Sequence, residues 1–183
     1  NRKGVITQMV KDKKIAWHAG KSKWKKFVNL NDVSLGIELV NKGHQFGYQK
    51  FSDQQIKSLI KLCKKLKKKY AIKKENFLGH SDIAPVRKID PGKNFPWKKL
   101  SGHNIGQWFN QNKKFLIRNE KNRRSTFFKN LHKIGYRYFN INKKSTNDKK
   151  IIQSFQQRYL PKNVTGKIDY KTLKISQFLV KQP

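Results

Sequence analysis

The spacing of apolar residues predicts one long amphipathic helix in the first half of the chain. Between Ser52 and Tyr70 the apolar positions recur at helical spacing, with lysines between them. Ser52 and Gln55 form a plausible capping box at the start of this helix, because each can satisfy a backbone N–H of the other. Cys63 lies in the apolar stripe, so we expect it to be a small buried residue and not a reactive thiol.

Shorter runs predict β-strands before this helix. Val5–Val10 and Ile15–His18 fit a hairpin, since the residues between them are polar. Ser34–Val40 is the strongest strand candidate, with Glu38 on the face opposite Leu35, Ile37 and Leu39. The segment 21–32 is expected to be a loop.

After the long helix, the pattern predicts a closing helix near 105–109 and then three short helices. The first of the three covers Phe127 to Ile134, the second Ile151 to Tyr159, and the third follows Asp169 as a possible N-cap. Charge rises and the pattern weakens over residues 113–124. We therefore expect a first domain over 1–112, a linker over 113–124 and a small helical domain over 125–183.

Composition adds a strong positive charge. The chain has 183 residues, with 44 Lys and Arg against 10 Asp and Glu, a formal net charge of +34. Such a chain should bind polyanions. Nucleic acid, acidic lipid and anionic wall polymers all remain candidate partners. A single cysteine excludes an internal disulfide, and no apolar run is long enough to span a bilayer. Since the chain begins at Asn1, we expect a fragment or a processed product.

The loop from Gly79 to Gly92 contains residues that can bind a metal. It contains His80 and Asp90, and imidazole and carboxylate are both good Zn²⁺ ligands. Pro85 and Pro91 would stiffen the loop, while Asp82 can cap a turn or orient His80. A His and an Asp at this spacing could also simply pair within a turn, so the spacing alone leaves both readings open.

Four separate motifs carry a resemblance to a known family. They are Ala16–Gly20 (AWHAG), Asn31–Glu38 (NDVSLGIE), Gly79–Pro85 (GHSDIAP) and Arg87–Gly92 (RKIDPG). In this order they resemble the type 2 N-acetylmuramoyl-L-alanine amidases, which share their fold with peptidoglycan recognition proteins. Within that family the likeness is greatest to the branch with a carboxylate zinc ligand and a wall-binding C-terminal module. The motifs span most of the first hundred residues.

The resemblance implies an α/β fold, a mixed β-sheet flanked by helices with zinc at its edge. It implies hydrolysis of the amide between N-acetylmuramic acid and L-alanine in peptidoglycan or anhydro-muropeptides. Zinc would activate water and polarise the carbonyl, a carboxylate would move the proton, and a fixed cation would stabilise the oxyanion.

The resemblance also implies roles for particular residues. His80 and Asp90 match the second and third zinc ligands, Glu38 matches the general acid/base, and Lys88 matches an oxyanion-stabilising lysine. The expected substrate-binding residues are His18, Trp17, Asn31 and Arg87. The first zinc ligand of the family lies on a strand that would precede residues 1–10, so we expect two of three ligands here. His44 and His103 lie in no matching motif and are expected at the surface.

The C-terminal part has a looser likeness to the three-helix peptidoglycan-binding domain. The segments that carry it are Leu131–Tyr136, Ile152–Arg158 and Gly166–Thr172. Phe155 is expected in the core of this module and not as a sugar platform. Such a module would raise the local substrate concentration by tethering. It also favours a periplasmic, envelope-associated or secreted protein over a cytoplasmic one.

Two other classes of function stay open at this point. The chain could be a non-catalytic peptidoglycan-binding protein, because this fold can bind muropeptides after losing zinc ligands. It could also be a basic nucleic-acid-binding protein, although only the net charge supports that reading and no nucleic-acid-binding motif appears. No obligate protein partner is inferred.

Overall fold

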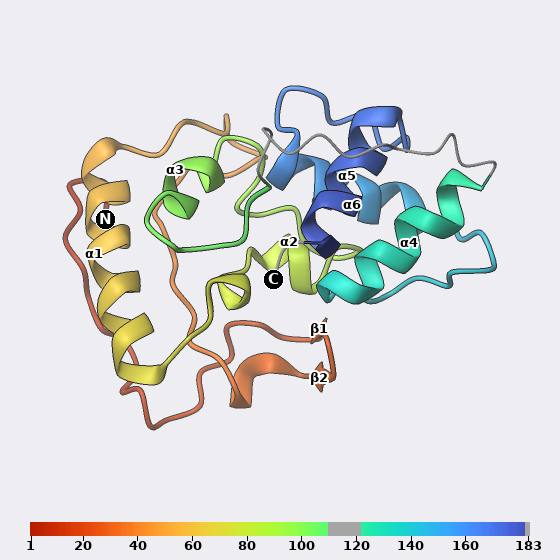
Figure 1. The fold of residues 1–183 in the computed structure, drawn as a ribbon. Coiled ribbons are helices and arrows are strands. Elements are labelled where there is room, and N and C mark those ends of the chain that lie inside the picture. Colours follow the sequence, from red (N-terminus) through yellow and green to blue (C-terminus); the bar gives the residue numbers. More distant parts are fainter. Residues whose placement is uncertain (110–121, 182–183) are drawn as a thin grey trace.

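A computed structural model describes residues 1–109 and 122–181. The helices are α1 (Asp53–Tyr70), α2 (His80–Ile83), α3 (Trp97–Ser101), α4 (Arg123–Ile134), α5 (Asp148–Tyr159) and α6 (Tyr170–Lys181). A two-stranded antiparallel sheet joins β1 (Lys23–Trp24) to β2 (Phe27–Val28), and short 3-10 turns cover Leu30–Asp32 and Lys74–Asn76. Helix α1 lies at one end of the molecule, α4 to α6 lie at the other, and α2 lies between them (Figure 1).

The long helix is confirmed where the apolar stripe predicts it. Ser52 is the N-cap of α1, and its side chain and that of Gln55 form both bonds of a capping box. Cys63 is 3% exposed and belongs to a core that α1 shares with α3. Besides Cys63, the buried members of this core are Ile56, Leu59, Ile60, Phe95, Trp97, Leu100 and Ile105.

The three C-terminal helices are also confirmed. Helix α4 ends before Gly135, and α5 ends before the Leu160–Pro161 step. Asp169 acts as the N-cap of α6, since its Oδ1 accepts a hydrogen bond from the Thr172 backbone N–H at 2.7 Å. Phe155 is fully buried, as expected of a core residue.

The predicted strands are not formed as regular structure within the described residues. Val5–Val10, Ile15–His18 and Ser34–Val40 pair with no strand among the described residues, where β1 and β2 form the only sheet. A strand is defined by hydrogen bonds to a neighbour, so an apolar alternation without a partner does not form one. As a result Leu35 and Ile37 stay 39% and 38% exposed. The observed architecture is therefore helix-rich, and the expected mixed sheet is not formed within the described part of the chain.

The predicted closing helix near 105–109 is also wrong. The helix lies earlier, as α3, and Gly106 has a φ of 82° in the left-handed region, which ends any right-handed helix at that point. Ile105 is nevertheless buried, so its apolar side chain reflects packing in the core and does not indicate a helix.

The hydrophobic core crosses the boundary expected between two domains. Ala19, Trp24, Leu30 and Ile83 pack in the same cluster as the buried residues of α4, α5 and α6. The expected linker over 113–124 lies mostly outside the described residues, and its last two positions begin α4. The division into 1–112 and 125–183 stays a prediction, but the two parts share one core.

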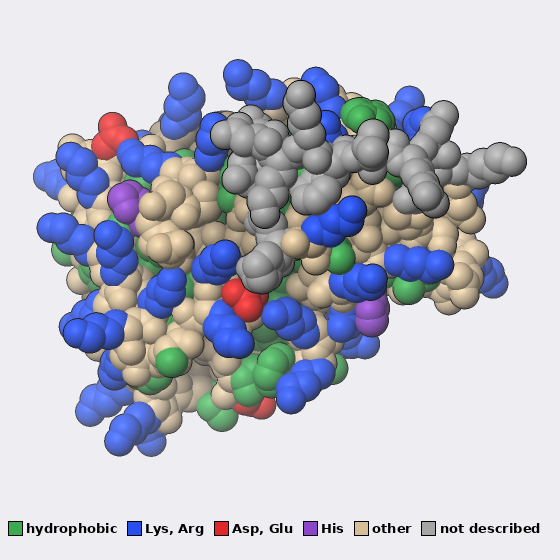
Figure 2. All heavy atoms as spheres, in the orientation of Figure 1, with side chains coloured by type: hydrophobic (Ala, Val, Ile, Leu, Met, Phe, Trp, Pro, Cys, Tyr) green, Lys and Arg blue, Asp and Glu red, His purple; other side chains and the backbone are tan. Residues whose placement is uncertain are grey.

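Positive charge covers the surface widely. Figure 2 shows Lys and Arg side chains spread over the whole of the visible face, with few acidic side chains between them. No helix in the described residues is both long and apolar enough to cross a membrane. On this face the positive charge is spread out and does not mark out one groove.

The burial of Cys63 predicts that its thiol reacts slowly. Burial raises the pKa of this thiol to about 11, so at pH 8 the reactive thiolate is only on the order of 10⁻³ of the population. We expect a colorimetric thiol reagent to label the folded protein at least about 100-fold more slowly than the protein in denaturant. Cys63 is the single cysteine, so the signal has no background from other thiols. Equal labelling rates in the two states would contradict the buried position.

Candidate metal and catalytic site

The loop from Gly79 to Gly92 folds back on itself and brings the two proposed zinc ligands together. The Ser81 backbone N–H donates to the Asp90 carbonyl at 2.8 Å. A Cβ added at Gly79 would lie 2.6 Å from Pro91 Cδ, so only glycine permits this approach of the two ends. His80 Nδ1 then lies 3.2 Å from Asp90 Oδ2.

A backbone carbonyl fixes the orientation of the His80 ring. His80 Nε2 lies 3.1 Å from the Ala19 carbonyl oxygen, which can only accept a hydrogen bond. Arg87 Nη2 also lies 3.4 Å from Nε2, so Nε2 faces Ala19 and Arg87, and Nδ1 is the nitrogen that faces Asp90. This is the arrangement that orients a histidine ligand in metal sites, with one nitrogen bonded to a carbonyl and the other facing the ion.

The Asp90 carboxylate lies among positive charges. Partial burial opposes its ionisation, but the hydrogen bond and charge of His80, with a smaller effect of Lys88, lower its pKa below the usual value. Asp90 is thus a carboxylate at neutral pH, and its Oδ2 can accept a hydrogen bond from Nδ1 or bind a cation together with it. Lys88 is half-buried and acts on Asp90 by charge, and its role at the oxyanion stays a prediction.

Asn31 and Arg87 both support the backbone that orients His80. The Asn31 side-chain oxygen accepts hydrogen bonds from the N–H groups of Ala19 and Gly20, at 2.8 and 3.2 Å. Arg87 donates to the Ala19 carbonyl at 2.8 Å. Their expected contact with substrate stays a prediction, and in this structure both side chains hold the turn that contains Ala19.

Within the described residues, no hydrogen bond or ion pair joins the remaining predicted residues to the His80–Asp90 pair. Trp17 is 90% exposed. The His18 ring lies 2.9 Å from both the Ala16 carbonyl and the Ser34 hydroxyl. Glu38 is exposed on the extended segment that follows Ser34, and within the described residues it forms no hydrogen bond or ion pair with the loop. The roles of these residues stay predictions.

The donor set fits part of a zinc site. An imidazole nitrogen and a carboxylate oxygen face each other, and both are common ligands of Zn²⁺. Across residues 1–109 and 122–181, no group of three or more His, Cys, Asp or Glu is placed to hold a metal. His44 and His103 are exposed, as expected. His80 and Asp90 are therefore the residues that would hold the ion, and the described residues supply these two.

Sequence reasoning missed residues that hold the loop from outside. The Tyr48 hydroxyl donates to the Pro91 carbonyl and accepts from the Asn94 N–H at 3.0 Å. Arg158 of α5 forms a buried ion pair with Asp82. A signal for Arg158 exists in the sequence, because it lies seven residues after Ile151 and so on the apolar face of its helix.

Comparisons with known proteins agree on one family. The profile of the N-acetylmuramoyl-L-alanine amidase family matches residues 1–93. The N-acetylmuramoyl-L-alanine amidase AmiD of Escherichia coli (strain K12) is 35% identical over 191 residues, covering 100% of this chain and 69% of AmiD. The 1,6-anhydro-N-acetylmuramyl-L-alanine amidase AmpD of Haemophilus influenzae is 42% identical over 99 residues, covering 54% of this chain and 52% of AmpD.

Solved structures give the same result. AmiD from E. coli, in complex with the substrate anhydro-N-acetylmuramic acid-L-Ala-D-gamma-Glu-L-Lys, superposes with a TM-score of 0.82 at 32% identity. That match covers 96% of this chain and 72% of the AmiD chain. AmpDh3 from Pseudomonas aeruginosa gives a TM-score of 0.83 at 30% identity, covering 94% and 71%. The chain belongs to the N-acetylmuramoyl-L-alanine amidase family, and the resemblance read from its motifs is confirmed.

The hydroxyl of Tyr48 is predicted to stabilise the Asp90 end of the loop. Replacing Tyr48 with Phe removes two hydrogen bonds and should lower the free energy of unfolding by roughly 1–3 kcal/mol. Tyr70→Phe is the matched control, because the Tyr70 hydroxyl contacts Asp12 at the exposed surface, and we expect a change within about 0.5 kcal/mol. Urea unfolding of both variants measures the difference. Equal losses would argue against a structural role of Tyr48.

Proposed function

We propose that this protein is a zinc-dependent hydrolase that cleaves the amide bond between N-acetylmuramic acid and L-alanine. The single observation that carries the proposal is the His80–Asp90 pair, held at 3.2 Å inside a loop that the family profile covers. The orientation of His80 by the Ala19 carbonyl supports a ligand more than a simple turn contact, because it directs Nδ1 toward the carboxylate.

The substrate class follows from the relatives. AmiD and AmpDh3 have been solved with anhydro-muropeptides, an anhydro-N-acetylmuramic acid tripeptide and an anhydromuramic pentapeptide. Because this chain covers most of both structures at 30% identity or more, we propose peptidoglycan and anhydro-muropeptides as its substrates. No obligate protein partner is part of the proposal.

The chemistry divides between the metal and the residues of this chain. Bound zinc would polarise the scissile carbonyl and lower the pKa of water, and His80 and Asp90 would hold it. Glu38 would accept the proton of the attacking water and deliver it to the leaving amine of L-alanine. The Lys88 ammonium would stabilise the negative charge on the carbonyl oxygen. His18 and Trp17 would bind the substrate, and Trp17 is 90% exposed.

The mixed sheet also belongs to the proposal. Ser34–Val40 is extended and keeps its alternation of apolar side chains, with Leu35 and Ile37 partly exposed. We propose that this segment pairs with a further strand in the α/β fold of the family. Pairing would bury the apolar face and would hold Glu38 on the opposite one.

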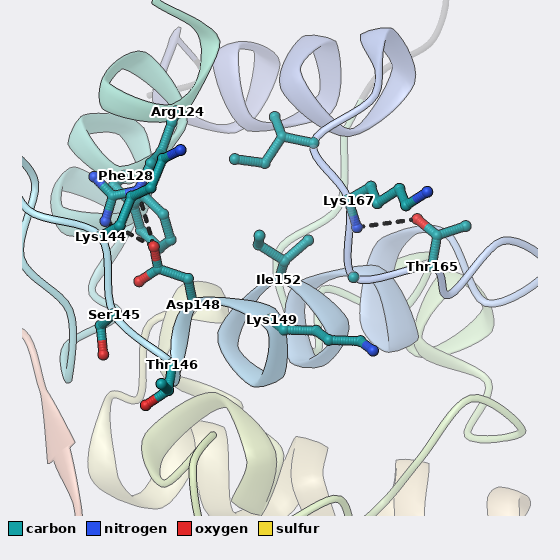
Figure 3. Close-up of a pocket in the computed structure, with 12 residues that line it drawn as sticks. Arg124, Phe128, Lys144, Ser145, Thr146, Asp148, Lys149, Ile152, Thr165 and Lys167 are labelled. Carbon is teal, nitrogen blue, oxygen red and sulfur yellow. Dashed lines mark hydrogen bonds and ion pairs between the residues drawn. The ribbon is translucent and has the colours of Figure 1, made fainter.

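We propose that the C-terminal helices contact wall material directly. A hollow of about 460 Å³ lies against α4, α5 and the segment before α6. Figure 3 shows Ile152 of α5 facing into it, with Lys149 and Lys167 beside it. An apolar floor with cationic side chains suits peptidoglycan, whose stem peptides combine aliphatic groups with carboxylates. A wall-binding surface of this kind supports a periplasmic or other envelope location.

Two alternatives have different support. Non-catalytic binding of muropeptides is favoured by the presence of two, and not three, metal ligands in the part of the chain that the structure describes. Nucleic-acid binding is less well supported, because the positive charge in Figure 2 is spread out and not gathered into a groove.

Metal removal and two substitutions test the enzyme proposal. With anhydro-muropeptide as substrate, chelation and Asp90→Ala should each abolish release of the peptide, and added Zn²⁺ should reverse the chelation. Glu38→Gln should lower kcat about 10²- to 10⁴-fold while leaving zinc affinity unchanged. Asp53→Ala, at an exposed acid on α1, is the control. Hydrolysis that survives both chelation and Asp90→Ala would exclude the zinc mechanism, and zinc-independent binding without hydrolysis would favour the non-catalytic alternative.

Removing three lysines tests the wall-binding surface. The triple variant Lys144→Gln, Lys149→Gln, Lys167→Gln should co-sediment several-fold less with purified peptidoglycan, because these cations line the hollow. The control carries the same loss of charge on α1, as Lys57→Gln, Lys61→Gln, Lys65→Gln. If both triple variants lose binding equally, net charge and not the hollow determines wall affinity.

A further inference from the structure

A buried carboxylate lies beside the proposed zinc ligand and takes no part in the mechanism. The Asp82 side chain is 2% exposed. It accepts hydrogen bonds from the Gly79 N–H at 2.8 Å and from the Tyr136 hydroxyl, and it is paired with the Arg158 guanidinium. Asp82 is thereby tied to its own loop and to two residues of the C-terminal part of the chain.

Arg158 contacts the chain on both sides of His80. Nη1 of the guanidinium donates to Asp82, and Nη2 donates to the Phe77 carbonyl at 3.1 Å. The guanidinium also lies over the Trp97 ring, with Cζ 3.8 Å from its centroid. Because one rigid planar group joins positions 77 and 82, the segment that contains His80 is fixed at both ends.

A second residue of α5 acts at the same place. Ser154, about one turn before Arg158, donates its hydroxyl to the Ser81 carbonyl at 2.6 Å. The Ser81 N–H in turn donates to the Asp90 carbonyl. Helix α5 therefore contacts the residue that follows His80 in the chain and is hydrogen-bonded to Asp90. Figure 1 shows α2 lying between the N-terminal part and these helices, as this arrangement requires.

Stability alone does not explain a buried ion pair. Replacing such a pair with apolar or neutral groups is often neutral or stabilising, because two charges must be taken out of water. Arg158 Nε moreover has no hydrogen-bond partner among the described residues, which adds to that cost. A role in fixing geometry is the better physical reason for keeping the pair at this position.

We propose that Arg158, acting through Asp82, is a positioning residue that holds His80 toward Asp90 for metal binding. Helix α5 is then a structural part of the metal centre, in addition to any contact it makes with the cell wall. The proposal rests on the zinc site of the proposed function. It predicts that the C-terminal helices and the metal affinity of the loop are coupled.

The test uses the full chain and two readouts. Arg158→Met, Arg158→Lys and the double variant Arg158→Met with Asp82→Asn are compared for zinc dissociation constant, by chelator competition, and for hydrogen exchange at the Ser81 amide. We expect zinc binding about 10- to 100-fold weaker in the double variant, with faster exchange at Ser81 while exchange in α1 is unchanged. Arg158→Lys keeps the charge but cannot reach both partners, so it should be intermediate. If Arg158→Met fails to fold, the double variant provides the test of the proposal, because it leaves no unpaired buried charge.

The matched control is a second Arg–Asp pair, which joins α4 to α5. Arg124 and Asp148 are paired at 2.8 Å with 18% and 14% exposed side chains, and the other hydrogen bonds of Arg124 go to backbone carbonyls within residues 140–143. Arg124→Met with Asp148→Asn should leave zinc affinity and Ser81 exchange unchanged. Unchanged zinc affinity and Ser81 exchange in the Arg158 and Asp82 double variant, or equal changes in this control, would overturn the proposal. If the wild-type chain binds no zinc, the metal site of the proposed function fails, and Ser81 exchange alone then decides whether Arg158 holds the loop.

Discussion

The buried pair of Arg158 and Asp82 is the interaction on which the arrangement of this molecule depends. It joins the last third of the chain to the loop that contains His80, in a place where both side chains are almost fully out of water. Two such charges are tolerated only when further donors satisfy the carboxylate, and the Gly79 N–H and the Tyr136 hydroxyl do so. The packing around the pair follows from this requirement, since the surrounding core contains residues from both parts of the chain.

Further contacts hold the rest of the candidate site in place around this ion pair. The close approach of Gly79 to Pro91 closes the loop, and Tyr48 holds the Asp90 end from the other side. Asn31 fixes the turn whose Ala19 carbonyl orients the His80 ring. Supporting contacts of this kind set ligand geometry in metal sites, and here they come from segments far apart in the sequence.

The charge of the chain acts at longer range. With +34 spread over the surface, attraction to anionic wall material does not require a specific groove and should weaken with salt. The hollow beside Ile152 is different, because it combines cations with an apolar floor. Family membership and these two features together support an enzyme that works on or near peptidoglycan.

By itself the sequence determined the long helix α1, the three C-terminal helices and the family, because these depend on local spacing and on contiguous motifs. The capping box at Ser52, the burial of Cys63 and the N-cap at Asp169 all follow from neighbouring residues.

Tertiary structure decided the rest. The alternation of Ser34–Val40 could not become a strand without a neighbour to bond, and the apolar run near Ile105 could not become a helix past Gly106. Nor could spacing show that Arg158 pairs with Asp82, because 76 residues separate them and only the folded core brings their charges together.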